Sequence, residues 1–148
     1  MKTDVIFSSI RMDWGTPKDL FDSLDNQFHF TLDPCANDQN HKCEKYFTEK
    51  QDGLKQDWAG ERVFCNPPYG RDVSKWVKKC YDETNDGNCR LAVMLLNART
   101  DTRWFHEYIY HKADEIRFIK GRLQFEGSTN RAPFPSMIVI FWGKEMKF

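Results

Sequence analysis

Four residues with unusual combined chemistry follow a short apolar run near the middle of the chain. The run, residues 63–65, is apolar as in a buried strand, and after it come Asn66, Pro67, Pro68 and Tyr69. Asparagine offers a side-chain carbonyl as an acceptor. The prolines hold the neighbouring backbone rigidly, because proline fixes its own φ and restricts the residue before it. The sequence thus places rigid hydrogen-bond acceptors beside an aromatic ring.

Such acceptors suit an NH₂ group whose lone pair is delocalised into a π system. This nitrogen is a poor nucleophile, and two acceptors arranged tetrahedrally around its hydrogens favour the pyramidal state with a free lone pair. The Asn66 side-chain oxygen and the Pro67 carbonyl can be these acceptors, and Tyr69 can stack on the planar group. We predict a site that activates an amine by positioning and preorganised dipoles rather than by a strong base.

A proline-stiffened turn with no chemical role is the other interpretation of the same residues. Their place directly after an apolar strand favours a function. The motif alone does not separate an amine on a nucleobase from the amide of a glutamine side chain. DNA, RNA and protein substrates therefore stay open at this step.

The chain before this motif predicts a helix, a short strand and then irregular structure. Thr16 suits the N-cap and Pro17 the first turn of a helix whose apolar residues recur at helical spacing. Residues 28–32 predict a strand that ends at Asp33. Residues 35–60 are polar with scattered aromatic residues, and we expect loops and short helical turns there.

The chain after the motif predicts two helices and three strands. Apolar residues from Val73 onward recur at i, i+3, i+4, i+7 and i+8, which indicates an amphipathic helix ending near Gly87. Residues 91–96 are apolar on both faces, as in a central parallel strand.

The last part of the chain completes the order of elements. Thr100 or Asp101 can cap a further helix that runs through about His111. Two strands are expected near residues 115–125 and 137–142. Helices that alternate with strands, followed by a final strand pair, indicate an α/β fold.

Polar or rigid residues follow three of the predicted strands. These endings are Asp33-Pro34, Asn66-Pro67 and the segment that begins at Asn97. If the strands are parallel, all three endings lie at one edge of the sheet, where ligands bind in such folds. The sequence therefore predicts a binding site at that edge.

Length and composition indicate a single soluble domain. The chain has 148 residues, of which 40% are hydrophobic and 30% charged. No run approaches the roughly 18 apolar residues of a membrane span, and the first residues are too polar for a signal peptide. We expect a cytoplasmic protein that makes no contact with a membrane.

The charge is zero overall but is unevenly distributed. Residues 1–61 hold seven basic and twelve acidic side chains, whereas residues 62–148 hold fifteen basic and ten acidic ones. A nucleic-acid-binding protein needs only one basic face. An imbalance without function is the alternative that composition alone favours.

Neither a metal site nor a disulfide framework is predicted. The five cysteines are odd in number and include no C-x-x-C pair. His106 and His111 are five residues apart, so on a helix they diverge instead of sharing one face.

The motifs in their order resemble one family. They are W-G-T-P-K, L-D-P-C-A, Q-D-W, N-P-P-Y-G, A-R-T-D-T-R-W-F, K-G-R-L-Q-F and A-P-F-P-S, spread over residues 14 to 141. This pattern resembles the phage-type DNA N6-adenine methyltransferases, which depend on S-adenosylmethionine. The resemblance implies a compact, partly reduced Rossmann-like class I methyltransferase sheet, flanked by helices and with a terminal strand pair. It also implies DNA as the partner and a flipped-out adenine as the target.

By this resemblance, Asn66, Pro67, Pro68 and Tyr69 are the catalytic residues. Asp33 is similar to the carboxylate near the amino-acid part of the cofactor. The residues implied to bind the cofactor are Trp14, Thr16, Pro17, Asp33, Pro34, Cys35, Asp57, Trp58 and Asn66. Those implied to meet DNA phosphates are Arg99, Arg103, Lys120, Arg122 and Arg131.

One departure from the wider methyltransferase pattern is visible. Asp33 is followed by Pro34, Cys35 and Ala36, without the glycine-rich turn that lets backbone approach the cofactor. A catalytically silent module that only binds nucleic acid is therefore a competing hypothesis. We expect one domain over residues 1–148, with no separate target-recognition domain and with sequence readout from residues 127–136 or a partner subunit. A homo-oligomer is left open, and a phage-encoded protein would act in the host cytoplasm.

Overall fold

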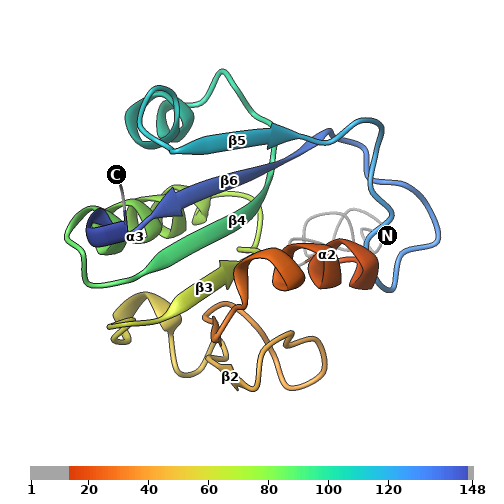
Figure 1. The fold of residues 1–148 in the computed structure, drawn as a ribbon. Coiled ribbons are helices and arrows are strands. Elements are labelled where there is room, and N and C mark those ends of the chain that lie inside the picture. The colour runs from red at the N-terminus through yellow and green to blue at the C-terminus, as the bar shows by residue number, and fades with distance from the viewer. Residues whose placement is uncertain (1–13, 147–148) are drawn as a thin grey trace.

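A mixed six-stranded sheet forms the centre of the molecule in the computed structural model, which describes residues 14–146. In chain order the strands are β1 (Leu32–Asp33), β2 (Lys45–Tyr46), β3 (Arg62–Cys65), β4 (Leu91–Asn97), β5 (Glu115–Phe118) and β6 (Ser136–Trp142). The spatial order is β2-β1-β3-β4-β6-β5 (Figure 1). The strands β2, β1, β3 and β4 are parallel, and β6 runs antiparallel between β4 and β5. The predicted α/β class with a terminal strand pair is confirmed.

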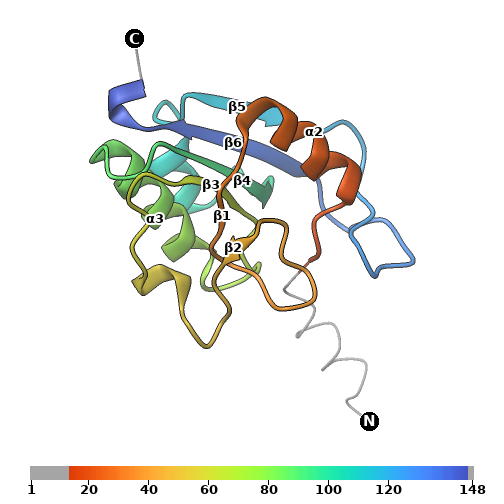
Figure 2. The ribbon, with the colours of Figure 1, turned by 60° about the horizontal axis from the view of Figure 1, so that its bottom comes forward.

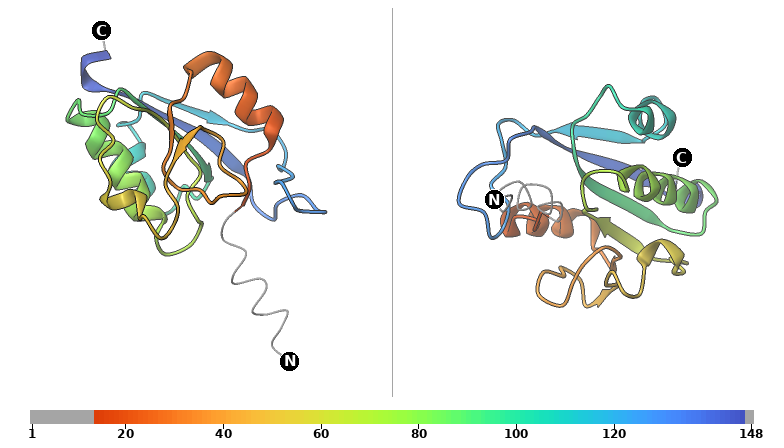
Figure 3. Two further views of the ribbon diagram at one scale, coloured as in Figure 1. Left: turned by 90° about the horizontal axis from the view of Figure 1, so that it is seen from below. Right: turned by 180° about the vertical axis from the view of Figure 1, so that it is seen from behind.

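Helices cover both faces of this sheet. The two longer ones, α2 (Lys18–Phe28) and α3 (Val73–Asn85), lie on opposite faces (Figure 3). The π-helix η2 (Phe105–Ile109) packs beside α3, and the short 3₁₀ helices are η1 (Gly53–Lys55) and η3 (Lys144–Met146). Within the described part of the chain, no helix has the length and apolar character that a membrane span requires.

The helix and strand predicted after the Asn66–Tyr69 motif are confirmed. Val73, Trp76, Val77 and Cys80 are buried on one side of α3, as their spacing predicts. The first six residues of β4 are buried, because this strand has neighbours on both edges and helices on both faces. As predicted, β4 is a central strand, but it is parallel to only one of its neighbours: it pairs with β3 in the parallel sense and with β6 in the antiparallel sense.

The strand predicted over residues 28–32 exists, but its start is wrong. Phe28 is the last residue of α2, where it is buried with Phe21 and Leu24 on the apolar face of the helix. His29 then takes a left-handed conformation with φ of 56° and ends the helix, so that β1 is only Leu32–Asp33. The helix extends to Phe28 because it buries one more aromatic side chain there.

Both predicted helix caps are also wrong. Pro17, not Thr16, occupies the N-cap position of α2, and its carbonyl accepts a hydrogen bond from the Phe21 amide at 3.0 Å. Thr102, rather than Thr100 or Asp101, has the hydroxyl that accepts from the Phe105 amide at 3.3 Å. The helix expected to reach His111 is the π-helix η2, which ends at Ile109.

The irregular region and the last strands follow the predictions in outline. Residues 35–60 hold loops, η1 and the unpredicted two-residue strand β2. The strand expected over residues 115–125 ends at Phe118, and residues 119–135 form a long loop that leads into β6. Because β1, β3 and β4 are adjacent and parallel, their polar endings lie at one edge of the sheet, as predicted (Figure 2).

Candidate active site

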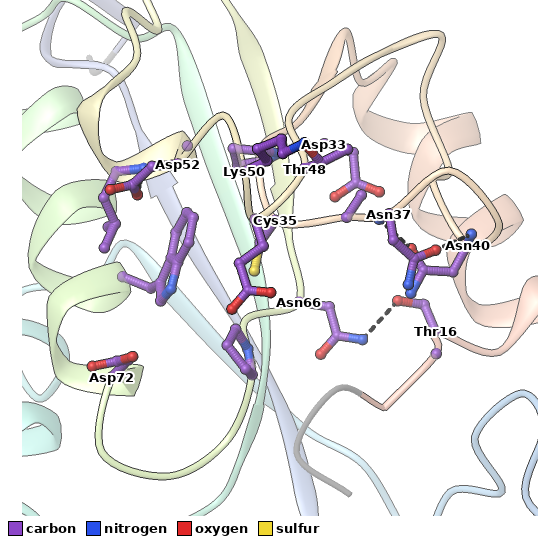
Figure 4. Close-up of a pocket in the computed structure, with 18 of the residues that line it drawn as sticks. Thr16, Asp33, Cys35, Asn37, Asn40, Thr48, Lys50, Asp52, Asn66 and Asp72 are labelled. Atoms are coloured by element: carbon purple, nitrogen blue, oxygen red, sulfur yellow. Dashed lines mark hydrogen bonds between the residues drawn. The ribbon is translucent and has the colours of Figure 1, made fainter. Parts of the chain in front are cut away.

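A cavity of about 920 Å³ opens at this carboxyl edge. Three stretches of the chain form its walls: the segment before α2, the loops around β1 and β2, and the turn from β3 into α3 (Figure 4). Of the sequence-predicted residues, the structure brings together on its wall Trp14, Thr16, Asp33, Pro34, Cys35, Asn66 and Pro68. Pro17 is half-buried at the start of α2 and is not part of the wall.

Asn66 is held by its amide nitrogen. This nitrogen donates to the Trp14 carbonyl and, at 3.0 Å, to the hydroxyl of Thr16 (Figure 4). The contacts fix the orientation of the amide and leave Oδ1 as the remaining acceptor. Within residues 14–146, Oδ1 is buried and accepts no hydrogen bond. An acceptor of this kind on a cavity wall is suited to an N–H donor of a ligand.

The segment that holds Asn66 is itself tied to distant parts of the chain. The Glu126 amide donates to the Gly15 carbonyl at 2.9 Å, and the Glu126 carboxylate accepts from Lys42 at 2.8 Å. These contacts join three segments around the Asn66–Tyr69 motif: residues 119–135, the loop after β1 and the segment before α2. None of these contacts is visible in the local sequence.

Tyr69 is buried and does not line the cavity. Its hydroxyl donates to the Leu95 carbonyl at 3.3 Å, and burial raises the pKa of this hydroxyl. The ring packs edge-on against Phe134 and Phe125, with centroids 5.3 Å and 6.4 Å away, and both of those rings also contact Trp14. Pro67 is buried beside it. The predicted stacking surface of Tyr69 is therefore covered by the loop of residues 119–135.

Asp33 combines burial with a place on the cavity wall. It is only 4% exposed, and burial raises its pKa to about 6, against the lowering effect of hydrogen bonds from the amides of Lys42 and Cys35. The Lys42 amide donates to Oδ2 at 2.9 Å. A carboxylate that is poorly solvated in this way is suited to a cationic ligand group.

Trp58 lies behind the wall instead of on it. It is fully buried, and its indole nitrogen donates to the Gly53 carbonyl at 3.0 Å. Its ring also stacks at 6.5 Å on Trp76, which does line the cavity. Asp57 is exposed and accepts from the Ala59 amide at 3.0 Å. The structure thus does not bring Asp57 and Trp58 to the cavity.

Gly53 lets the backbone of η1 pack closely on the turn after β1. A Cβ atom on Gly53 would lie 2.0 Å from the Pro34 carbonyl oxygen. Only glycine allows η1 to pack this closely on the Asp33-Pro34 segment. Gly53 thereby helps to set the shape of the cavity wall, which both segments line.

Several wall residues were missed by the sequence predictions. They come from the irregular region and the start of α3, and they are Ala36, Asn37, Asp38, Gln39, Asn40, Thr48, Glu49, Lys50, Asp52, Gly53, Leu54, Asp72, Lys75 and Trp76. The one local signal was the unusual density of Asn, Asp and Gln between β1 and β2. With Asp33, the wall holds five carboxylates against two lysines, so the cavity is acidic.

The five basic residues predicted to meet DNA are all exposed, and they fall into two groups. Arg99 and Arg103 follow β4, and each has an acidic neighbour, at 3.6 Å and 3.8 Å respectively. The second group, on residues 119–135, is Lys120, Arg122 and Arg131, where Arg131 donates to the Arg122 carbonyl at 2.8 Å.

A second cavity, of about 460 Å³, lies between α3 and η2. Arg103 lines it together with Lys75 and Lys78, and the half-buried rings of Trp104 and Tyr108 form the rest of the wall with Ser74 and Glu107. Lys75 also lines the first cavity, so the two are neighbours. Cations beside aromatic rings are typical of surfaces that bind nucleic-acid strands.

Comparison with known proteins gives the family. The family model described as DNA N-6-adenine-methyltransferase (Dam) matches residues 5–146. The chain belongs to this family. The DNA N-6-adenine-methyltransferase of Haemophilus phage HP1 is 31% identical over 137 residues, which are 86% of this chain and 77% of that protein. A protein of the same name from Escherichia phage T1 is 32% identical over 111 residues, 73% of this chain and 45% of that protein.

Membership of the DNA N-6-adenine-methyltransferase family confirms the resemblance inferred from the motifs. The matched region contains Asn66, all three stretches that line the larger cavity and the loop over Tyr69.

Proposed function

We propose that the protein transfers the methyl group of S-adenosylmethionine to the N6 amine of an adenine extruded from DNA. Family membership supports the activity of an adenine-specific DNA methyltransferase. The observation that carries the proposal is the unpaired Asn66 Oδ1 on the cavity wall, because it offers an acceptor to an amine N–H.

In this proposal Asn66 activates the amine. Trp14 and Thr16 fix its amide nitrogen, so Oδ1 accepts one N6 hydrogen while the Pro67 carbonyl accepts the other. The N6 lone pair then points at the methyl carbon. S-adenosylmethionine supplies that carbon on a cationic sulfur. The N–C bond would form as the C–S bond breaks, with the C–S electron pair left on sulfur and one N6 proton released to water.

The larger cavity suits this cofactor in size and charge. S-adenosylmethionine carries a sulfonium, an ammonium and a carboxylate, and an acidic wall favours its net positive charge. Asp33 would hold the ammonium, beside Pro34 and Cys35. Glu49 and Asp52 would accept from the ribose hydroxyls. After transfer the sulfur is neutral, so the same wall favours release of the product.

The adenine requires a rearrangement before it can stack on Tyr69. Phe125 and Phe134 cover that ring, and both belong to the loop of residues 119–135. We infer that this loop moves when DNA binds. The loss of the aromatic contacts is offset by stacking with the base.

DNA contact is proposed on the basic residues around the site. Arg99 and Arg103, with the cavity between α3 and η2, would bind the phosphates of one DNA strand. The second group would bind phosphates elsewhere on the duplex; it consists of Lys120, Arg122 and Arg131. Residues 127–136 would read the DNA sequence. The cytoplasm is the expected location, and a homo-oligomer is one way to enlarge the DNA surface.

The fold supports a finer assignment as well. The parallel strands β1, β3 and β4 with their ligand edge are consistent with a reduced Rossmann-like sheet of the class I methyltransferases.

The test is methyl transfer from labelled S-adenosylmethionine to unmethylated DNA. We expect label in N6-methyladenine, and a loss of at least about a hundredfold in kcat for Asn66→Ala. The matched control is Asn85→Ala, at the exposed end of α3. Melting temperature and calorimetry with the cofactor show whether the variants fold and bind.

Each alternative from the sequence has a distinct outcome in this assay. Label that resists nuclease but is released by protease would indicate a protein amide as the substrate, and label in RNA would indicate RNA. Absence of cofactor binding at millimolar concentration would indicate a silent binding module. Unchanged transfer by Asn66→Ala would reject the catalytic assignment.

A further inference from the structure

Three buried side-chain atoms accept or donate no hydrogen bond within residues 14–146. They are Oδ1 of Asn66, Oδ1 of Asn97 and Oγ of Ser136. All three lie at the carboxyl edge of the sheet, because Asn66 follows β3, Asn97 ends β4 and Ser136 begins the antiparallel β6. The strands β3, β4 and β6 are neighbours in that order, and Asn97 pairs directly with Ser136. The three atoms therefore form a row across adjacent strands.

The row lies on the α2 face of the sheet. Phe64 packs edge-on against Phe21 of α2 at 5.1 Å, and Phe64 pairs with Val93. Side chains alternate along a strand, so Asn97, four residues after Val93, points to the same face, and so does its partner Ser136. Asn66, two residues after Phe64, contacts Trp14 and Thr16 in the segment that leads into α2.

The aromatic side chains around Tyr69 enclose the same place. The Tyr69 hydroxyl reaches from the end of β3 to the Leu95 carbonyl on β4, two residues before Asn97. Phe134 is two residues before Ser136, and its ring contacts Tyr69 at 5.3 Å. The row of unpaired atoms and the proposed stacking surface of the base thus share one covered region.

Proteins pair nearly all their buried polar atoms, so three unpaired ones in a row require a physical reason. A ligand with a matching polar edge is such a reason. Adenine offers N6 hydrogens as donors and, on either side of the amine, the ring nitrogens N1 and N7 as acceptors. A hydroxyl can donate to a ring nitrogen, and an asparagine amide can donate with Nδ2 or accept with Oδ1.

We propose that Ser136 and Asn97 bind the ring-nitrogen edge of the extruded adenine and set the selectivity for this base. The inference rests on the proposed function, in which Asn66 binds the amine. The three side chains would then read the amine and its flanking ring nitrogen together. Guanine and thymine carry an oxygen in place of this amine, and contact with N7 also excludes cytosine, whose amine has no ring nitrogen on that side.

The test uses Ser136→Ala and Asn97→Ala, with Ser23→Ala on the exposed face of α2 as the control. Because the target sequence need not be known, the substrate is DNA in which every adenine is replaced by 1-deazaadenine or by 7-deazaadenine. We expect kcat/KM on normal DNA to fall about tenfold or more in each variant, with the KM for S-adenosylmethionine unchanged. Wild type should be slowed by one of the two analogues, and Ser136→Ala should not be slowed further by it.

Stability separates recognition from a structural role. If Ser136 has no protein partner, Ser136→Ala removes an unpaired buried hydroxyl, and its melting temperature should equal or exceed that of wild type. A lower melting temperature with unchanged kcat/KM would overturn the inference. Binding of the analogue-substituted DNA gives the same comparison without methyl transfer: equal affinity of wild type for all three DNAs would also overturn it.

The two proposals fail in different ways. If Asn66→Ala is inactive while Ser136→Ala and Asn97→Ala keep full activity and the same base selectivity, the recognition role is lost and the proposed function stands. If wild type transfers no methyl group to any DNA, the proposed function fails first.

Discussion

On one side of Asn66 lies an open cavity lined by carboxylates, and on the other lies a closed set of aromatic rings around Tyr69. The open side is polar and its shape is set by backbone contacts such as that of Gly53 with Pro34. The closed side is apolar apart from a row of unpaired polar atoms.

In the proposed function, S-adenosylmethionine binds on the open side and the target adenine on the closed side, so these two ligands meet different kinds of site. The cofactor side is preformed, so binding there needs little rearrangement. The base side is covered, and DNA binding has to uncover it, which ties access of the base to the arrival of the correct partner. Five predictions, in order of decreasing expected effect, test this difference.

Gly53→Ala should damage the open side most. Its Cβ atom would meet the Pro34 carbonyl at 2.0 Å, so η1 must move and the cavity wall with it. We expect cofactor affinity to fall about tenfold to a hundredfold, measured by calorimetry. Gly60→Ala is the control: with φ of 72° and open space around it, it should destabilise the fold by about 1 kcal/mol and leave cofactor affinity unchanged. Equal affinities in both variants would contradict a preformed cavity.

Asp33 should make cofactor binding depend on pH. Burial raises its pKa to about 6, so the carboxylate that attracts the cationic cofactor is present above about pH 6 and is lost as pH falls through that value. Calorimetry from pH 5 to 8 should show tighter binding at the higher pH, and Asp33→Asn should weaken binding and remove this dependence. A pH profile that Asp33→Asn leaves unaltered would assign the titration to another group.

The same group affects the stability of the protein without cofactor, with the opposite sign. Because folding raises this pKa from 3.8, the stabilising contribution of Asp33 is complete below 3.8 and is lost as pH rises to about 6. Denaturant unfolding at pH 4 and pH 7 should show that the free energy of unfolding of wild type falls, relative to that of Asp33→Asn, as the pH rises.

Thr16→Val should affect the boundary between the two sides. It keeps the shape of the side chain but removes the hydroxyl that accepts from Asn66 at 3.0 Å. We expect kcat to fall about tenfold, because one hydrogen of the Asn66 amide loses its partner and the orientation of Oδ1 is less well fixed. Thr16→Ser retains the hydroxyl and should recover most of the rate; no recovery would indicate that packing matters more than the hydrogen bond.

The smallest effect is expected on the cavity between α3 and η2. Replacing Lys78 and Arg103 by Gln should raise the KM for DNA and reduce the slope of log KM against log salt by about one for each lost phosphate contact. Lys144→Gln, exposed on η3, is the control. An unchanged slope would place the DNA on the other basic group, around Arg122.

Local sequence patterns determined a large part of the fold. The motif after β3, the amphipathic α3 and the apolar β4 were predicted because apolar periodicity and proline chemistry act over a few residues. The order of motifs determined the family as well. The predictions that failed, such as the Thr16 cap and most of the strand over residues 28–32, lie at the two ends of α2, where Pro17 begins the helix and His29 ends it.

Only the tertiary structure decided that an open acidic cavity lies on one side of Asn66 and a closed set of aromatic rings on the other. A partner of Asn66 is Thr16, fifty residues away, and Gly53 packs on Pro34 so closely that only a glycine fits. The burial of Tyr69 under Phe134 and the row formed by Asn97 and Ser136 likewise depend on segments that meet only in the folded sheet. Contacts between distant segments depend on how the elements pack, and no pattern within a single segment records them.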